Sequence, residues 1–403
     1  MTVDTIPMPL DPLARSAPPS RPFSAAEPAR QTLPVEFSGS GSEYFRIWIV
    51  NLLLTLLTLG LYYPWAKVRR LRYFYSNTSL GGYALDFHGD PKRMLRGFLL
   101  VGAMVLLYSV AGRVSPLAGL IAFLIVAALW PALFRASQQF RMANTSWRGL
   151  RFRFDGDQAG AYRAMLPLFV PSAITLVGVL LSDGARRAGD GLASLAGLAA
   201  LLLFPLFFWM LKKYQHDHYG LGQLKTELRT GAGSFYALAL KSFGVMILAV
   251  LAAGTLAAVV GGFGALALVF GGAGERASPA AIFGIVVLFL AVYAGVILVV
   301  FPYVSSRLQN LVWSRTRSRL VEFDSALGYW PPLRLSLKNW LLVLVTVGLY
   351  LPFAKVATAR LRLEAVSVRL LLPPDELVST LRERADDASG DAAGDLFGID
   401  IGL

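Results

Sequence analysis

Eight long stretches without a charged residue constrain this chain more than any other feature of its sequence. An α-helix needs about 20 apolar residues to cross the hydrocarbon core of a bilayer. Only 16% of the residues are charged, against about 25% in an ordinary soluble domain, so the chain lacks the surface that water requires. The sequence therefore predicts an all-α polytopic membrane bundle. The stretches cover residues 47–66, 97–112, 117–134, 164–182, 192–211, 242–270, 281–304 and 339–354.

The Lys and Arg residues between these stretches alternate in number. Seven follow the first stretch and six follow the third, whereas only Arg113 follows the second and only Arg276 the sixth. Basic connections stay in the cytoplasm under the positive-inside rule. The rich connections are therefore expected on the cytoplasmic side of the membrane.

The first and last stretches carry the same motif, NLLLTLLTLGLYYPWAK at 51–67 and NWLLVLVTVGLYLPFAK at 339–355. Glycine and proline interrupt both copies, and proline removes a backbone hydrogen bond, so a bend is expected near 59–63. Two full crossings here would place both tails and their cations outside, against the charge rule. We expect two broken, re-entrant segments beside six full transmembrane helices, with eight ordinary spans as the alternative. The matched residues are Asn51, Gly60, Tyr62, Pro64 and Lys67, and Asn339, Gly348, Tyr350, Pro352 and Lys355.

Other segments echo this arrangement and indicate a repeated module. Pro131, Pro205 and Pro302 each precede basic residues, and Phe-x-Gly occurs at 37–39, 87–89 and 154–156. Alternating segments at 83–87, 150–155 and 360–368 predict small cytoplasmic β-strands. Residues 1–33 are predicted to be a disordered tail and 34–372 a membrane domain of repeated modules. Residues 373–403 are predicted to be an acidic tail, mostly disordered after a short helix.

The block from Glu43 to Lys67, followed by Arg72-Tyr-Phe and Asn77-Thr, resembles the YjgN-like family of bacterial inner-membrane proteins. The resemblance covers roughly 34–370, and its specific part is the twice-present Gly-x-Tyr-x-Pro-[Trp/Phe]-Ala-Lys. It implies a multi-pass protein of the bacterial inner membrane with unassigned activity. The family has no established catalytic or binding residues to carry over.

Two functions fit the sequence. Broken membrane segments related by repetition are typical of transporters, which favours a channel or transporter-like protein for a small solute or lipid. The ten matched residues would then lie near its site, although Asn51 and Asn339 equally suit a structural role at the interface. No carboxylate lies inside any stretch, which disfavours proton or sodium coupling. The alternative is a membrane scaffold or regulatory protein that docks a partner through its basic loops.

Other classes of protein have little support. The chain has no cysteine and three histidines, and the Gln215-His216-Asp217-His218 segment offers too few converging ligands for a metal. We therefore expect no enzyme activity, no metal and no cofactor. The basic loops are expected to contact anionic lipid headgroups rather than nucleic acid. A protein partner or a homo-oligomer is compatible with the sequence.

Overall fold

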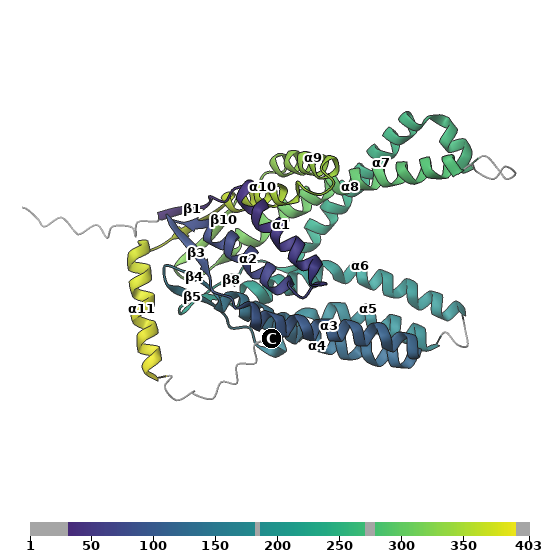
Figure 1. Ribbon diagram of the computed structural model, residues 1–403. Coiled ribbons are helices and arrows are strands. Elements are labelled where there is room, and N and C mark those ends of the chain that lie inside the picture. The colour runs from purple at the N-terminus through teal and green to yellow at the C-terminus, as the bar shows by residue number, and fades with distance from the viewer. Residues whose placement is uncertain (1–30, 182–185, 271–278, 392–403) are drawn as a thin grey trace, which may run out of the picture.

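The chain is mainly helical in this computed structural model, which describes residues 31–181, 186–270 and 279–391 (Figure 1). Of the tail predicted at 1–33, the first 30 residues lie outside the described part, and a strand begins at Gln31. Of the tail predicted at 373–403, residues 374–391 form a helix, α11 (Pro374–Asp391), and the last twelve residues lie outside the described part.

Ten further helices form five consecutive hairpins in the described ranges, each with an outgoing and a returning helix. Six of them, α3 to α8, are long and apolar enough to cross a membrane, which is the number of full spans predicted. The hairpins are α1 (Gly41–Leu57) with α2 (Tyr63–Ser76), α3 (Pro91–Val114) with α4 (Pro116–Ala143), α5 (Gln158–Leu181) with α6 (Arg186–His216), α7 (Ala232–Phe270) with α8 (Pro279–Trp313), and α9 (Trp330–Val345) with α10 (Leu351–Glu364).

The β-structure is more extensive than the small strands that the sequence predicted. All eleven strands of the described residues join one antiparallel sheet in the order β7-β6-β5-β4-β3-β2-β1-β11-β10-β9-β8. Six of them have only two or three residues, too few for an alternating pattern to be recognised. The strands are β1 (Gln31–Phe37), β2 (Thr78–Leu80), β3 (Tyr83–Phe87), β4 (Thr145–Trp147), β5 (Leu150–Phe154), β6 (Tyr219–Leu221), β7 (Leu224–Lys225), β8 (Glu227–Leu228), β9 (Thr316–Arg317), β10 (Val321–Ser325) and β11 (Val366–Leu370).

Each helical hairpin is inserted between two strands that pair with each other. The flanking pairs are β1–β2, β3–β4, β5–β6, β8–β9 and β10–β11. One backbone hydrogen bond closes the base of each hairpin, so every hairpin leaves the sheet and returns to it at the same place. The donor and acceptor residues are Ser38 and Asn77 (2.9 Å), His88 and Asn144 (2.8 Å), Asp155 and His218 (3.1 Å), Arg229 and Arg315 (2.8 Å), and Ala326 and Ala365 (3.0 Å).

A proline stands thirteen residues before each of these five acceptors. All five are buried, in the first turn of α2 and α10 and in the interior of α4, α6 and α8. The loose echoes in the sequence are thus members of one fivefold structural repeat. The prolines are Pro64, Pro131, Pro205, Pro302 and Pro352.

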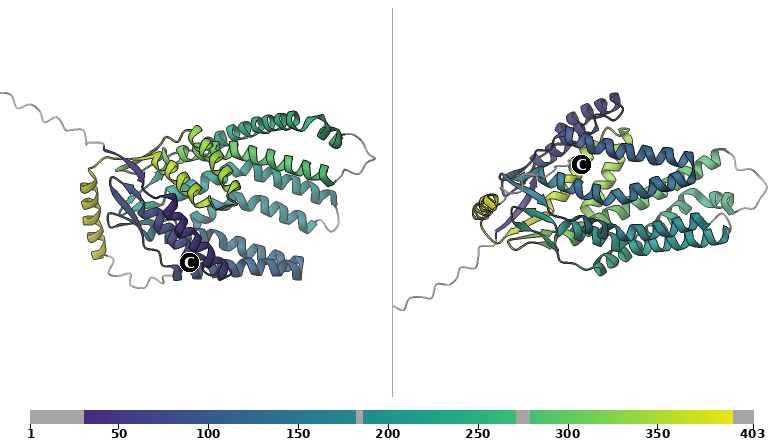
Figure 2. Two further views of the ribbon diagram at one scale, coloured as in Figure 1. Left: turned by 45° about the horizontal axis from the view of Figure 1, so that its top comes forward. Right: turned by 90° about the horizontal axis from the view of Figure 1, so that it is seen from below.

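The five modules close into a ring. The first and last strands pair, with Gln31 opposite Leu370, and α1 packs against α10. Successive modules contact each other through α2–α3, α4–α5, α6–α7 and α8–α9. The outermost strands in the sheet order, β7 and β8, are joined by Thr226 alone, so the chain itself links these two edges. Figure 2 shows the long helices projecting together from one end of the sheet.

Helix α11 lies across the opposite end of the sheet (Figures 1 and 2). Its buried residues Leu377 and Leu381 pack with Leu33, Trp147 and Leu370 from three strands. The main hydrophobic cluster of the described residues therefore lies between the strands and α11, which covers it. Beyond it, many large hydrophobic side chains of the long helices are exposed, as expected for surfaces in contact with lipid.

The first and last hairpins turn in the same way. Gly60 and Gly348 have φ of 94° and 89°, and the N–H of each donates to a carbonyl five residues earlier at 2.8 Å. The bend predicted at 59–63 is therefore present, between α1 and α2. Its cause is the pair of left-handed residues Leu59 and Gly60, because Pro64 lies in the first turn of α2, where its missing N–H costs no helical hydrogen bond.

The strand predicted at 360–368 is wrong in its first half. Residues up to Glu364 continue α10, and only Val366–Leu370 forms β11. The alternating pattern is overridden because each residue added to an existing helix gains one backbone hydrogen bond. The strands predicted at 83–87 and 150–155 are present as β3 and β5.

The turn geometry makes a prediction for Gly60. A Cβ at Gly60 would meet nothing within 4 Å, so only the positive φ opposes a side chain. Gly60→Ala should lower the free energy of unfolding by about 1–2 kcal/mol. Gly102→Ala is the control: Gly102 lies within α3 and is equally open, so alanine should keep or slightly raise stability. Thermal unfolding in detergent micelles measures both, and equal effects would contradict the assignment.

Candidate functional site

The ten residues matched by sequence occupy equivalent places in the first and last modules. Gly60 and Gly348 lie at the two hairpin tips, whereas the prolines and lysines lie in the returning helices α2 and α10. No hydrogen bond between described residues joins the first set of five to the second. The repeat therefore marks a shared local fold.

Asn51 and Asn339 are buried at 7% exposure each, in α1 and α9. The Oδ1 atom of each accepts no hydrogen bond within the described structure. Asn339 Nδ2 lies 3.4 Å from Thr358 Oγ1, a weak contact. Their unsatisfied carbonyls are a cost to stability.

The tips of the first and last hairpins are apolar and uncovered. Leu59 and Val347 are 95% and 92% exposed. Just behind each tip, Tyr62 stacks on Trp65 at 6.1 Å and Tyr350 stacks on Phe353 at 5.4 Å. Uncovered apolar tips followed by aromatic pairs are the arrangement expected of segments that insert into lipid.

A different set of residues gathers polar side chains from all five modules. Counted from the proline of each module, they stand at positions 3, 6, 7 and 10, which lie along one face of a helix. Positions 3 and 10 are about 10 Å apart along a helix axis. This set, the axial cluster, consists of Lys67, Arg70, Gln138, Arg141, Lys212, Gln215, Gln309, Lys355 and Arg362.

Contacts between modules establish that the axial cluster is one group. Arg362 Nε of the fifth module donates to Gln309 Oε1 of the fourth at 2.8 Å. Lys212 of the third module lies within electrostatic range of both Arg141 and Arg362. The third and fifth modules are not neighbours in the ring, so the electrostatic interaction of Lys212 with Arg362 joins modules that are not adjacent. Arg141 also approaches Lys67 of the first module.

Two further contacts complete the ring and its polar lining. Lys355 of the fifth module lies within electrostatic range of Arg70 of the first. Arg141 Nη2 donates to Gln138 Oε1 at 2.6 Å, and Lys212 Nζ donates to Gln215 Oε1 at 3.1 Å. The side chains that hydrogen-bond to these cations are thus neutral: the buried amides of Gln138, Gln215 and Gln309, and the phenol of Tyr219, which bonds to Arg141.

The axial cluster carries six cationic side chains without a compensating carboxylate. Among the residues that the structure describes, none of the six forms an ion pair with Asp or Glu. Burial lowers the pKa of Lys67, and the positive charges of Arg70 and Arg141 lower it further. The Nε of Arg141 is buried without a hydrogen-bond partner. The centre of the ring is therefore strongly electropositive.

The sequence pattern indicates that most of these cations set the membrane topology. Only Lys67 and Lys355 were singled out, through the terminal repeat. The common spacing from the five prolines is the signal that would have found the others. It becomes visible once the weak copies at Pro131, Pro205 and Pro302 are aligned by their distance to the following strand.

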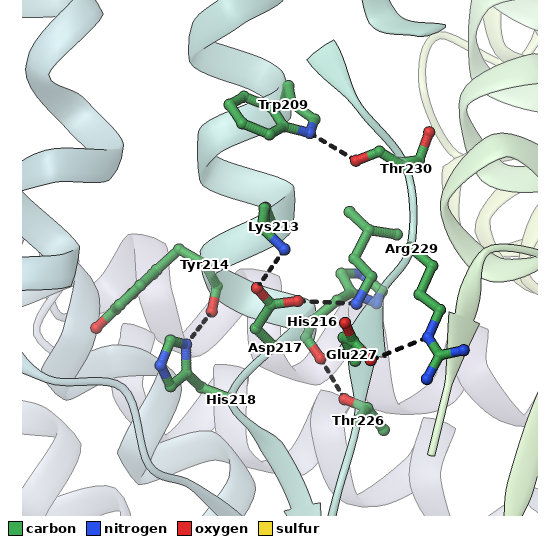
Figure 3. A network of polar contacts seen from close by, with 11 residues as sticks. Trp209, Lys213, Tyr214, His216, Asp217, His218, Thr226, Glu227, Arg229 and Thr230 are labelled. Atoms are coloured by element: carbon green, nitrogen blue, oxygen red, sulfur yellow. Dashed lines mark hydrogen bonds and ion pairs between the residues drawn. The ribbon is translucent and has the colours of Figure 1, made fainter. Parts of the chain in front are cut away.

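The segment 215–218 was considered above as a metal site. It holds the end of α6 against β8 and β9 (Figure 3). Asp217 accepts a hydrogen bond from the Leu228 N–H at 2.8 Å and pairs with Lys213 at 2.8 Å. His218 Nδ1 contacts the Tyr214 carbonyl at 2.7 Å, and His216 contacts Thr316 Oγ1 at 2.9 Å.

Thr226, the residue between β7 and β8, donates to the His216 carbonyl. Close by, Trp209 Nε1 donates to the Thr230 carbonyl at 2.9 Å (Figure 3). His216 thus uses its ring and its carbonyl in contacts with Thr316 and Thr226, whereas the His218 ring contacts its own helix and its carbonyl accepts from Asp155. This network therefore has a structural role where Thr226 links β7 to β8.

Comparison with known proteins identifies inner membrane proteins and a family of unknown function. The family model for a bacterial protein of unknown function, DUF898, matches residues 32–396. The inner membrane protein YjgN of Salmonella typhimurium is 29% identical over 173 residues, which cover 42% of this chain and 44% of that protein. YjgN of Escherichia coli K12 is 31% identical over 126 residues, 31% of each chain. The chain thus matches less than half the length of these relatives. No solved structure matches it.

The unsatisfied carbonyl of Asn51 yields a prediction. Asn51→Leu should leave the free energy of unfolding within about 1 kcal/mol of the wild type, because no hydrogen bond to Oδ1 is lost. Asn310→Leu is the comparison, since Asn310 Oδ1 accepts from Leu327 N–H and Ser325 Oγ, both at 2.9 Å. It should cost about 1–3 kcal/mol. Thermal unfolding in detergent measures both, and a larger loss for Asn51→Leu would show that it has a partner.

Proposed function

This chain belongs to that bacterial family of unknown function, and we propose that it carries a small solute across the inner membrane along the axis of its ring. The observation that carries the proposal is the axial cluster, in which five modules place polar and cationic side chains on one interior line. Polar and charged groups at membrane-embedded positions are costly, and they commonly mark a path for solute.

The closed ring supports the same proposal. Ten helices in lateral contact, with α10 against α1, surround one interior. Their outward side chains are apolar and suited to lipid. A path bounded in this way keeps polar solute away from hydrocarbon without a gap between helices.

We propose that α1–α2 and α9–α10 are re-entrant and that the sheet lies in the cytoplasm. Both ends of each short hairpin meet at the sheet, and α1 has only 17 residues, about 25 Å of helix. The connection between α3 and α4, at the far end from the sheet, carries the single cation Arg113. The basic residues concentrate at the sheet end, which places that end inside under the positive-inside rule.

Anionic lipid headgroups are the partners proposed for the basic surface at the sheet end. A shallow groove between α1 and α2 is lined by Arg46, Arg69 and Arg72 beside Ile47 and Val50. Cations beside apolar side chains suit a headgroup whose acyl chain continues along the helix. We propose no chemical reaction for the chain. A protein partner or a second copy of the chain would bind beside this surface.

The structure supports a closed state for the proposed path. Helix α11 covers the mouth of the sheet, and Leu381 packs beside the turn at Gly222. At the other end of the helix Arg148 pairs with Asp375. We propose that solute passes only when α11 moves away from the mouth of the sheet.

Flux through the purified full chain tests the proposal. The protein is reconstituted into liposomes loaded with a panel of neutral, cationic and anionic solutes, and release is compared with that from protein-free liposomes. Release of at least one solute is expected. Release of none, together with a protein that co-purifies in fixed ratio, would favour the scaffold alternative and overturn the proposal.

The covering helix gives a sharper prediction. Leu381→Glu places a carboxylate in the apolar cluster under α11 and should weaken its seating by several kcal/mol. Solute release should rise at least about tenfold, since the closed state loses more than 1.4 kcal/mol. Ser379→Glu, on the exposed side of the same helix, should leave release unchanged. Equal release from both variants would contradict a closing role for α11.

A further inference from the structure

The axial cluster indicates which class of solute the ring accepts. We infer that it binds a small oxyanion, of the phosphate or sulfate type, held between cationic side chains of different modules. The transport half of this inference rests on the proposed function, whereas the binding half stands independently of it.

The balance of charge is the first argument. Six cations from four modules share the ring interior, and no described Asp or Glu pairs with them. Like charges held together in a partly dehydrated site repel each other, and each disfavours the charged state of its neighbours. A bound anion removes this cost, whereas a cation increases it.

The available donors are the second argument. Arg141 keeps its buried Nε free of partners, although its Nη2 contacts Gln138. Lys212 has three N–H donors on Nζ, of which one contacts Gln215 Oε1. Guanidinium and ammonium donors on different helices are the groups that oxyanions accept hydrogen bonds from. The cluster thus offers unused donors as well as charge.

The arrangement across the ring is the third argument. Lys212 lies near Arg141 on one side and near Arg362 from a module two places away. An anion between these three residues would contact the second, third and fifth modules at once. Such a site can form only when the ring is closed, because its residues come from separate modules. This requirement explains why the cations of separate modules occupy the same helix face.

Binding is tested on the purified full chain in detergent, by calorimetric titration with sodium sulfate and then sodium phosphate at constant ionic strength. Saturable binding by the wild type is expected. Lys212→Gln should weaken it at least about tenfold, because a charge-assisted hydrogen bond is lost. Lys213→Gln is the matched control, since Lys213 is the next residue and pairs with Asp217 instead.

A second pair of variants guards against a folding defect in the first. Arg70→Gln, in the axial cluster, should weaken sulfate binding, whereas Arg163→Gln should not, since Arg163 is exposed and pairs with Asp157 outside the cluster. No saturable binding to the wild type, or equal weakening by Lys212→Gln and Lys213→Gln, would overturn the inference. Wild-type sulfate binding without sulfate release from liposomes would instead overturn the proposed passage and leave the anion site in place.

Phosphate of a lipid headgroup has the same chemistry as free phosphate, and delipidation separates the two sources. The phosphorus content of the purified protein is measured before and after exhaustive detergent washing. A headgroup occupant is indicated if sulfate binds only after the phosphorus is removed. A free oxyanion is indicated if the washing changes nothing.

Discussion

Backbone pairing between the first and last strands is the interaction on which the ring depends. β1 and β11 are separated by nearly the whole chain, yet they join through an antiparallel register from Gln31–Leu370 to Pro34–Ser367. Without this pairing, the ring would open between β1 and β11 and expose two further sheet edges beside those at β7 and β8, and such edges invite aggregation. With it, α1 meets α10, and the module faces turn toward a shared interior.

The repeated base hydrogen bond explains how modules of different length fit one ring. It fixes where each hairpin leaves and rejoins the sheet, so the helices can be 14 residues long in α2 and 39 in α7 without disturbing their neighbours. The buried proline thirteen residues before the acceptor sets a constant distance from the strand. Side chains at a given distance from the proline therefore stand at comparable depth in every module, which is what brings the axial cluster together.

The sequence predicted the parts of this architecture that have a long periodic or apolar signal. Six long helices, the break at Gly60 and Gly348, and the repeated proline motif were all accessible from the residues. The full extent of the sheet was not, because strands such as β7, β8 and β9 have two residues each, and β8 and β9 pair with partners distant in sequence. The terminal copies of the motif stood out because they are the most alike. Several of the cations that converge, such as Arg141 and Lys212, lie in the divergent copies. In the sequence they resemble ordinary juxtamembrane charges.

The central claim is that every hairpin leaves the sheet and returns to it on one side of the membrane. The chain has no cysteine, so single cysteines can be placed at Glu36 and Ser79, which pair across β1 and β2, and at Ser115 between α3 and α4. Intact cells are labelled with a membrane-impermeant maleimide. The account predicts labelling at Ser115 alone, with Glu36 and Ser79 reacting only after permeabilisation. Labelling of one of that pair without the other would show that α1–α2 crosses the membrane, and would contradict the ring.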